Sequence, residues 1–252
     1  MNKSTEKKPT YFYDRYNFHF KSKSREKLYL GKDHPFTEFL RLVQKQFKVL
    51  DVGCGGGFLT NLINKKTGCT ITGLDLSEKS LETARVMCKN ATFTKGDALH
   101  LPFANDSFDA LVSNGVIHHT PNPFKGFSEA IRVIKKKGII YMSVYNKAHI
   151  YSFLYATYGR FLRLFNPNKF WIQKIFHPLY RLKFKMYCSL FVGEWDSSIN
   201  TFNLFADAYL TPIAHFHTPK QMIEFGKKNG LEVLRAQSGN NGKMIIFIFR
   251  KK

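Results

Sequence analysis

The sequence predicts an α/β fold in which a mostly parallel β-sheet is covered by helices on both faces. Three observations predict it. Short apolar, β-rich runs alternate with helical patterns over residues 48–146, the order of elements that builds a parallel sheet. A glycine cluster follows the first of these runs, where the chain turns into a helix. Residues 218–252 end in two apolar runs joined by a turn-rich loop, which is typical of an antiparallel hairpin.

Size and composition limit the alternatives. The 252-residue chain is long enough to bury a core, and 44% apolar content is typical of a globular protein. Lys and Arg outnumber Asp and Glu by 39 to 18, and the formal charge of +21 favours partners such as nucleic acid, anionic membranes or acidic metabolites. The four cysteines form no metal-binding pattern, and no apolar signal segment follows the polar start. We expect free thiols, no metal site and a cytoplasmic location.

Five strands and three helices are expected in the first α/β part of the chain. Ser77 and Asn122 are suited to be N-caps, and Pro123 suits the first position of a helix. The strands are expected at 48–52, 69–75, 91–95, 108–113 and 138–144, and the helices at 58–65, at 78–89 and from Pro123 onward.

The C-terminal part predicts one helix and a hairpin. Thr218 and Gln221 flank Pro219 in the form of a capping box, so a helix is expected to run to about residue 229. Strands at 231–237 and 244–250 follow, joined by the turn residues 238–243. We expect them to form an antiparallel pair at the edge of the sheet.

Four motifs follow four successive strands. The glycines after Asp51 allow a sharp turn and let a ligand lie against bare backbone at a helix N-terminus. Asp75, at the end of the second strand, is placed to accept hydrogen bonds from both ribose hydroxyls of an adenosine. Asp97 with Ala98 follows the third strand, and Asn114 lies at the end of the fourth. Open α/β sheets bind ligands at this edge.

These motifs resemble, in order and spacing, those of class I S-adenosylmethionine-dependent methyltransferases. The matching strings are VLDVGCGGGF, GLDLS, GDALHLPF and FDALVSNGVIHHTPNP. The small-molecule type, which includes ubiquinone and menaquinone methyltransferases, is the most similar. The resemblance covers residues 48–146 and the hairpin. It implies a Rossmann-like, seven-stranded, mostly parallel sheet with a terminal antiparallel hairpin, and S-adenosylmethionine as cofactor.

The resemblance also implies roles for individual residues. The loop of Gly53, Gly55 and Gly57 would lie beside the methionine part of the donor, with Asp51 nearby. Asp75 would bind the ribose, Leu76 would pack on the adenine, Asp97 and Ala98 would meet its polar edge, and Asn114 would lie beneath the sulfonium. Where the family usually has Pro-Gly-Gly before the fifth strand, this chain has Lys135-Lys136-Lys137-Gly138, which still permits a turn. A dinucleotide dehydrogenase fits less well, because Asp51 heads a DxGxGxG loop and HHT follows the fourth strand.

The segments outside the donor-binding core have separate expected roles. We divide the chain into a basic, aromatic N-terminal segment (1–47) that covers the donor site, a donor-binding core (48–146), a helical lid (147–217) and a C-terminal completion of the sheet (218–252). Residues 147–193 contain eight Lys and Arg, no Asp or Glu, and thirteen aromatic side chains. That composition fits three alternatives: a lid over an apolar pocket, a lid that also contacts an anionic membrane, or a surface on which nucleic-acid bases stack. No uninterrupted apolar run is long enough to span a bilayer.

Histidines are the candidates for a general base. His118 and His217 are the first choices because the loops at the carboxyl edge of the sheet should bring them near the donor, and His119 and His215 are the others. The expected function is methyl transfer to a small lipophilic or acidic acceptor, either in the cytoplasm or at the inner face of a membrane. Two alternatives stay open: an RNA-directed methyltransferase, and a non-catalytic sensor or scaffold that binds the donor. Asn114-Gly115-Val116-Ile117 is unlike the Asn-Pro-Pro-aromatic string of enzymes that methylate nucleic-acid amino groups.

Overall fold

The structure is a computed structural model that describes residues 23–164, 172–187 and 201–252. A seven-stranded sheet with the order β3-β2-β1-β4-β5-β7-β6 forms its centre. Its strands are β1 (Lys48–Val52), β2 (Thr70–Asp75), β3 (Thr92–Lys95), β4 (Phe108–Asn114), β5 (Ile134–Tyr145), β6 (Leu231–Gly239) and β7 (Met244–Lys251). The first five strands pair in parallel, whereas β7 is antiparallel to both β5 and β6. The predicted fold class is therefore confirmed.

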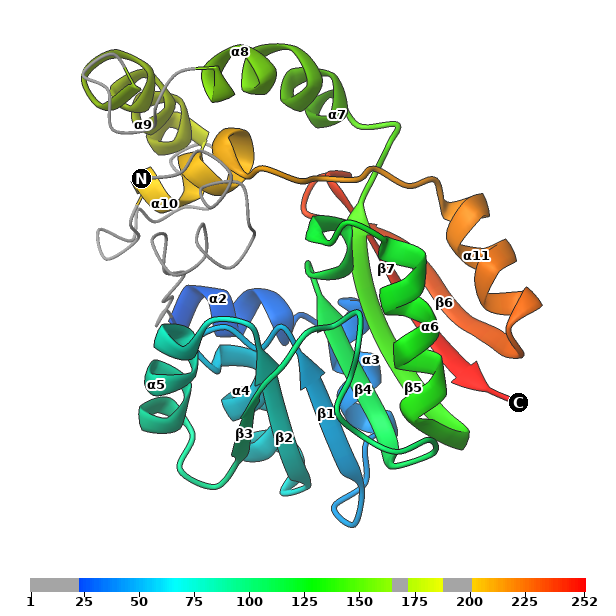
Figure 1. Cartoon of the computed structure of the whole chain (residues 1–252). Helices are drawn as coiled ribbons and strands as arrows, with labels where there is room; N and C mark the ends of the chain where they lie inside the picture. The colour runs from blue at the N-terminus through cyan, green and yellow to red at the C-terminus, as the bar shows by residue number, and fades with distance from the viewer. Residues whose placement is uncertain (1–22, 165–171, 188–200) are drawn as a thin grey trace.

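Helices cover both faces of this sheet (Figure 1). On one face, α3 (Pro35–Leu42) and α4 (Phe58–Thr67) pack on side chains of the core such as Val49 and Tyr141. On the other face, α6 (Pro123–Val133) and α11 (Pro219–Lys228) pack on Leu50, Met142 and Phe247. Alternate residues of each strand thus enter opposite cores, as the two-residue period of a strand requires.

The predicted helix starts are confirmed by hydrogen bonds. The Ser77 hydroxyl accepts from the Ser80 N–H at the start of α5 (Glu78–Met87), and the Asn122 side chain accepts from the Lys125 N–H before α6. Thr218 and Gln221 form both bonds of the capping box of α11. These side chains satisfy N–H groups that have no partner within the helix.

The start of β5 differs from the prediction. The expected turn at Lys135–Gly138 lies inside the strand, because Ile134 already pairs with Phe108 of β4. The register then shifts, so that the next pair joins Ala110 to Ile139, and Lys137 adopts a positive φ of 64° within this bulge. Lys135, Lys136 and Lys137 thus lie in a bulged first part of β5. Polar composition alone does not distinguish such a bulge from a turn.

A helical insertion lies between β5 and α11, beyond the carboxyl ends of the parallel strands (Figure 1). Its described elements are α7 (Ile150–Leu154), η2 (Tyr155–Gly159), α8 (Arg160–Arg163), η3 (Ile172–Phe176), α9 (His177–Tyr187), α10 (Thr201–Phe205) and η5 (Ala206–Leu210). Its two ends meet, because Asn146 forms a β-bridge with His217. The Lys147 N–H donates to the His217 carbonyl at 2.9 Å, and the His217 N–H donates to the Tyr145 carbonyl at 2.9 Å.

Of the predicted N-terminal segment, residues 1–22 lie outside the described part. The described portion holds α2 (Lys23–Tyr29) and α3. Cys54, Cys69 and Cys88 are buried free thiols, as predicted, and Cys188 is not among the described residues. Within the described ranges, no helix is both long enough and apolar enough to cross a bilayer.

Candidate functional site

The glycine loop between β1 and α4 is fastened to the end of β2. The N–H groups of Gly53 and Cys54 both donate to the Leu74 carbonyl, at 2.7 and 3.0 Å. Gly53, Gly55 and Gly57 all have positive φ, which a residue with a Cβ adopts only at a cost. An added Cβ at Gly53 would lie 2.4 Å from Val116, and one at Gly57 would lie 2.9 Å from Ala84, whereas one at Gly55 would meet no atom within 4 Å. Bare backbone thus faces open space at Gly55.

Asp75 and Asp51 flank this loop. The Asp75 carboxylate accepts from the Gly55 N–H at 2.8 Å and from the Ser77 N–H at 2.9 Å, so it is held rigidly beside the open glycine. Asp51 is buried and accepts a 2.6 Å hydrogen bond from the Thr60 hydroxyl. Burial, helped by the charge of Asp75, raises the pKa of Asp51 to about 7 although the Thr60 hydrogen bond opposes the rise.

The third motif lies next to the second. The Gly96 N–H donates to the Asp75 carbonyl at 3.0 Å, which sets the end of β3 beside the end of β2. The Asp97 carboxylate accepts from the Leu99 N–H and stays partly exposed. Ala98 is buried in the core, and Leu76 is half-buried just after Asp75.

Asn114, at the end of β4, is fixed from two sides. Its side-chain amide donates to the Tyr29 hydroxyl at 2.9 Å, and its carbonyl oxygen accepts from the Ser143 hydroxyl at 2.8 Å. Tyr29 comes from α2, so the N-terminal segment reaches this edge of the sheet. We call the strand ends that carry Asp51, Gly55, Asp75, Asp97 and Asn114 the motif edge.

A second group of polar residues lies where the insertion meets the core. His118 and His119 belong to η1 (Ile117–His119), the short helix that follows β4. Val116, just before η1, packs against Gly53, so η1 lies close to the glycine loop. The His215 N–H donates to the His118 carbonyl at 2.8 Å, and the His119 ring bonds the Ile213 carbonyl at 2.8 Å. The structure therefore brings His118, His119, His215 and His217 together, and we call them the histidine cluster.

The electrostatics of the histidine cluster keep its rings neutral. Both ring nitrogens of His118, and Nε2 of His217, are buried without a hydrogen-bond partner among the described residues. Burial, with neighbouring positive charge, lowers the pKa of His118 well below its usual value. Burial, with the charge of His215, lowers the pKa of His217 to about 4. Both rings are therefore neutral at pH 7 and able to accept a proton or a hydrogen bond.

Several residues of this region carry no motif in the sequence. Tyr145 ends β5 and packs its ring 3.9 Å from that of His118, and Lys243 reaches it from the β6–β7 hairpin. Tyr29 and Ser143 hold Asn114, and Thr60 holds Asp51. The position of Tyr145 at a strand end was a usable signal, whereas nothing near Lys243 in the sequence sets it apart.

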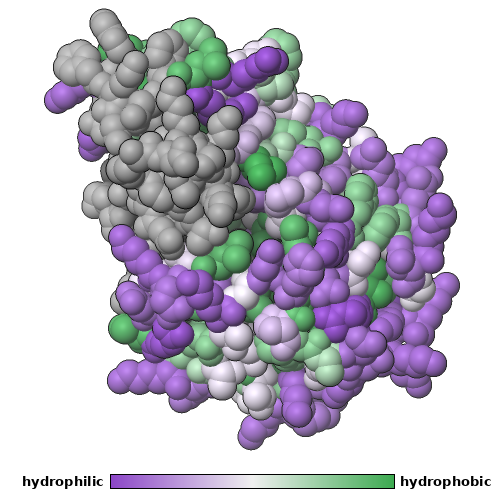
Figure 2. Space-filling model, viewed as in Figure 1, coloured by the Kyte–Doolittle hydropathy of each residue, from purple (hydrophilic) through white to green (hydrophobic). Residues whose placement is uncertain are grey.

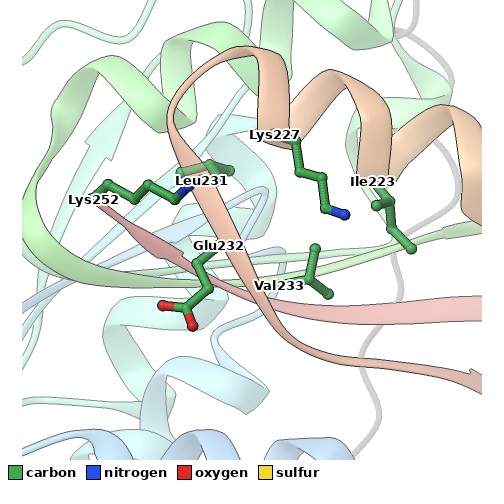
Figure 3. A pocket seen from close by; sticks show the side chains of 6 residues that line it. All are labelled: Ile223, Lys227, Leu231, Glu232, Val233 and Lys252. Carbon is green, nitrogen blue, oxygen red and sulfur yellow. The ribbon is translucent and has the colours of Figure 1, made fainter.

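A surface hollow between α11 and β6 lies away from both groups. Figure 3 shows that Lys227 and Ile223 of α11 point toward the strand residue Val233. Leu231 and Lys252 line the other end of the hollow. At this end β6 begins and β7 ends, and the last residues of β7 lie next to the first part of β5. The hollow is thus near the amino end of β5 and contains none of the predicted site residues.

Comparison with known proteins agrees with the geometry. A family model described as a methyltransferase domain matches residues 44–181, more than half of the chain. A 2-methyl-6-phytyl-1,4-hydroquinone methyltransferase of Oryza sativa is 39% identical over 40% of this chain and 30% of its own length. A demethylmenaquinone methyltransferase of Thermotoga maritima is 28% identical over 74% of this chain and 70% of its own. The chain thus spans less than a third of the rice relative.

Solved structures share the fold. A SAM-dependent methyltransferase of Methanosarcina mazei superposes with a TM-score of 0.54 at 18% identity, covering 85% of this chain and 96% of the other. The YcgJ protein of Bacillus subtilis superposes with a TM-score of 0.55 at 14% identity, covering 86% and 97%. At this identity the likeness concerns the fold alone.

Proposed function

The chain belongs to the methyltransferase domain family and is a class I S-adenosylmethionine-dependent methyltransferase, and from that premise we propose that it methylates the hydroquinone-type head of a lipophilic acceptor. The observation that carries the proposal is the similarity to proteins named for phytyl-hydroquinone and demethylmenaquinone methylation, combined with a neutral histidine cluster next to the motif edge. The first name specifies a phytyl-substituted hydroquinone and the second a demethylmenaquinone.

The motif edge fits the donor. Open space at Gly55 leaves room for a ligand against the backbone, and the adjoining Asp75 carboxylate would accept hydrogen bonds from ribose hydroxyls. Asp97 and Ala98 would meet the adenine edge, Leu76 would pack on its face, and Asn114 would lie beneath the sulfonium. The loop of Gly53 and Gly57, with Asp51 below it, would hold the methionine part. When bound, S-adenosylmethionine supplies a methyl group already activated by a sulfonium.

The work left to the chain is positioning and proton handling. Holding two reactants in line can lower the activation free energy by about 7–11 kcal/mol. His118 and His217 are neutral at pH 7, so either ring can accept the proton of an acceptor hydroxyl as the new bond to the methyl group forms. S-adenosylmethionine held at the motif edge would supply the methyl group that the acceptor gains, and the ring of His118 or His217 would hold the hydroxyl proton that the acceptor loses. The insertion covers this position and would exclude water.

We also propose that the insertion rests on an anionic membrane surface, where the acceptor's tail resides. Of ten exposed large apolar side chains in the described residues, eight lie between residues 150 and 186. They form two stripes at helical spacing: Ile150, Phe153, Phe161 and Leu164 on α7–α8, and Ile175, Leu179, Leu182 and Met186 on η3–α9. In Figure 2 green and purple side chains lie next to each other in the coloured upper part, while purple ones dominate the core below.

Charge supports the same location. Arg181, Lys183 and Lys185 lie between the apolar residues of α9, and residues 147–193 contain no acidic side chain. Apolar rings and chains at headgroup depth, flanked by cations, are typical of helices that lie in a membrane interface. A cytoplasmic protein bound at the inner face of a membrane fits this arrangement.

One assay tests the acceptor class. The protein and radiolabelled donor are incubated with a prenylated naphthohydroquinone, with the oxidised quinone of the same compound, and with total RNA. We expect label only in the reduced compound, because the oxidised form has no hydroxyl proton to lose. Label in RNA would favour the RNA-directed alternative, and donor binding without any transfer would favour a sensor or scaffold.

Flotation with lipid vesicles tests the membrane proposal. Wild-type protein should float with vesicles containing anionic lipid and much less with neutral ones. The double variant Phe153→Ser and Leu164→Ser should lose binding, because each removes an exposed apolar side chain from one stripe. Val86→Ser is the matched control, since Val86 is 72% exposed but belongs to α5 of the core. Equal flotation of all three proteins would contradict the proposal.

A further inference from the structure

The ring of Tyr145 is the centre of a buried cluster at the base of the insertion. It lies 3.9 Å from the ring of His118, 5.3 Å from that of His119 and 5.0 Å from that of Tyr151. Phe216 stacks on it at 5.5 Å. These residues come from β5, η1, α7 and the segment before α11, so the cluster joins the core to the insertion.

A lysine of the hairpin between β6 and β7 also contacts this cluster. Lys243 ends the tight turn between β6 and β7, and its Nζ lies 3.9 Å from the ring centre of Tyr151 and 5.1 Å from that of Tyr145. Asn146 fastens the turn, because its N–H donates to the Lys243 carbonyl and its side chain donates to the Gly242 carbonyl, both at 2.9 Å. The ammonium is therefore positioned by backbone contacts as well as by the rings.

The charge of Lys243 is only weakly compensated. Among the ion pairs between described residues, none joins Lys243 to a carboxylate. Burial lowers the pKa of Lys243, and the carboxylate of Asp207 opposes that effect from a distance. Asp207 lies nearer to His119, whose Nε2 is 3.9 Å from it. The titratable groups that face the lysine are Tyr145 of β5, Tyr151 of α7, Asp207 of η5, and the rings of His118 and His119.

Several buried polar atoms that lack partners among the described residues belong to His118 and His217 of the histidine cluster and to Thr211. In the described ranges, six buried side-chain polar atoms have no hydrogen-bond partner, and four of them are Nδ1 and Nε2 of His118, Nε2 of His217 and Oγ1 of Thr211. A buried polar group without a partner destabilises a fold, so such groups are usually satisfied by a ligand or by water. Here they accompany an ammonium held between aromatic rings, a setting that suits one oxygen-bearing, negatively charged group.

We propose that Lys243, with His118 and His217, binds an ionised oxygen of the acceptor, a phenolate or enolate. The inference rests on the proposed methyltransferase function and narrows it. An ammonium stabilises the anion that forms when an acidic hydroxyl loses its proton, and the neutral imidazoles complete the hydrogen bonds. The same ammonium repels a protonated amine. The site therefore selects acceptors with acidic hydroxyl groups and disfavours amines.

The test uses a phenol whose ionised form absorbs visible light. 4-Nitrophenol is titrated with the full-length protein at several pH values, and the bound phenolate is read from its absorbance. Wild-type protein should lower the apparent pKa of the bound phenol by about one unit, a roughly tenfold preference for the phenolate, which is typical of a nearby opposite charge. Lys243→Met should abolish the shift, and Lys243→Arg should retain most of it.

Two controls isolate the charge at this position. Lys227→Met removes a lysine from α11, outside the cluster, and should leave the shift unchanged. Donor binding by each variant, measured by calorimetry, verifies that the core is folded. A shift of equal size in Lys243→Met, or no shift in wild-type protein, would overturn the proposal. A lysine-dependent shift without methyl transfer to hydroquinones would instead preserve the oxygen site and refute the proposed reaction.

Discussion

The motif edge and the histidine cluster lie side by side but are built in opposite ways. At the motif edge each described polar side chain is held by the protein: Asp51 by Thr60, Asp75 by the Gly55 and Ser77 N–H groups, Asp97 by Leu99, and Asn114 by Tyr29 and Ser143. In the histidine cluster, His118 and His217 keep buried nitrogens that no described residue satisfies. One region is organised before its ligand arrives, while the other depends on a partner for its hydrogen bonds.

Replacing His118 should raise stability while lowering activity, and its effect on activity should be the largest of the predicted effects. In His118→Phe a ring of similar shape removes two unsatisfied nitrogens, so the free energy of unfolding should rise by about 1–3 kcal/mol. Methyl transfer should fall by about 10²–10⁴-fold if His118 is the proton acceptor. Thermal melts and transfer assays measure the two. His119→Phe is the contrasting control: it should lower stability, because His119 bonds the Ile213 carbonyl. A His118→Phe protein that is less stable than wild type would contradict the idea that the His118 ring lacks hydrogen-bond partners among the described residues.

Removing the Asp75 carboxylate tests the motif edge, whose side chains are held in place by the protein. Asp75→Ala deletes the proposed ribose contact and also frees the Gly55 N–H, so donor affinity should drop by about 10–100-fold, the loss typical of hydrogen bonds to a charged group. Calorimetric titration with the donor measures this. Glu82→Ala, on the exposed surface of α5, should bind the donor as wild type does. Unchanged affinity in Asp75→Ala would remove the ribose assignment.

The titration of Asp51 predicts pH-dependent donor binding. Its pKa is about 7 instead of 3.8, so the folded protein retains a proton that the unfolded chain loses, and the stability that this contributes is lost as pH rises from about 4 to about 7. A cationic donor favours the ionised carboxylate. Affinity should therefore rise about tenfold per pH unit below pH 7 and level off above it, with proton release on binding. Calorimetry in two buffers of different ionisation enthalpy measures the proton. Asp51→Asn should show neither effect.

The hydroxyl of Tyr29 offers the smallest and most local test. Tyr29→Phe removes one of the two groups that hold the Asn114 side chain while keeping the ring, so donor affinity should weaken about 2–10-fold. Ser143→Ala removes the other partner and should act similarly. If Tyr29→Phe and Ser143→Ala both bind the donor like wild type, Asn114 needs no fixed orientation.

The sequence predicted the motif edge far better than the histidine cluster, for a physical reason. Asp51, Asp75 and Asn114 each end a strand, so local strand and turn patterns suffice to place them at one edge. His118 and His217 were expected near the donor because they lie in loops at the same edge of the sheet, but their burial and their missing hydrogen-bond partners among the described residues depend on tertiary packing. Lys243 was missed, because it reaches Tyr151 only through the hairpin and the return of the insertion. The lysines before Gly138 were misjudged because a bulged strand and a turn share polar composition.

The bridge between Asn146 and His217 has a consequence for how such a chain diversifies. The insertion begins after β5 and returns to the end of the same strand, so β5 and α11 on either side need no rearrangement when its length changes. Lengthening a closed excursion costs little, since each doubling adds only about 0.6 kcal/mol of closure entropy. If residues 148–216 select the acceptor as we propose, exchanging them between relatives should change the acceptor and leave the donor site unchanged.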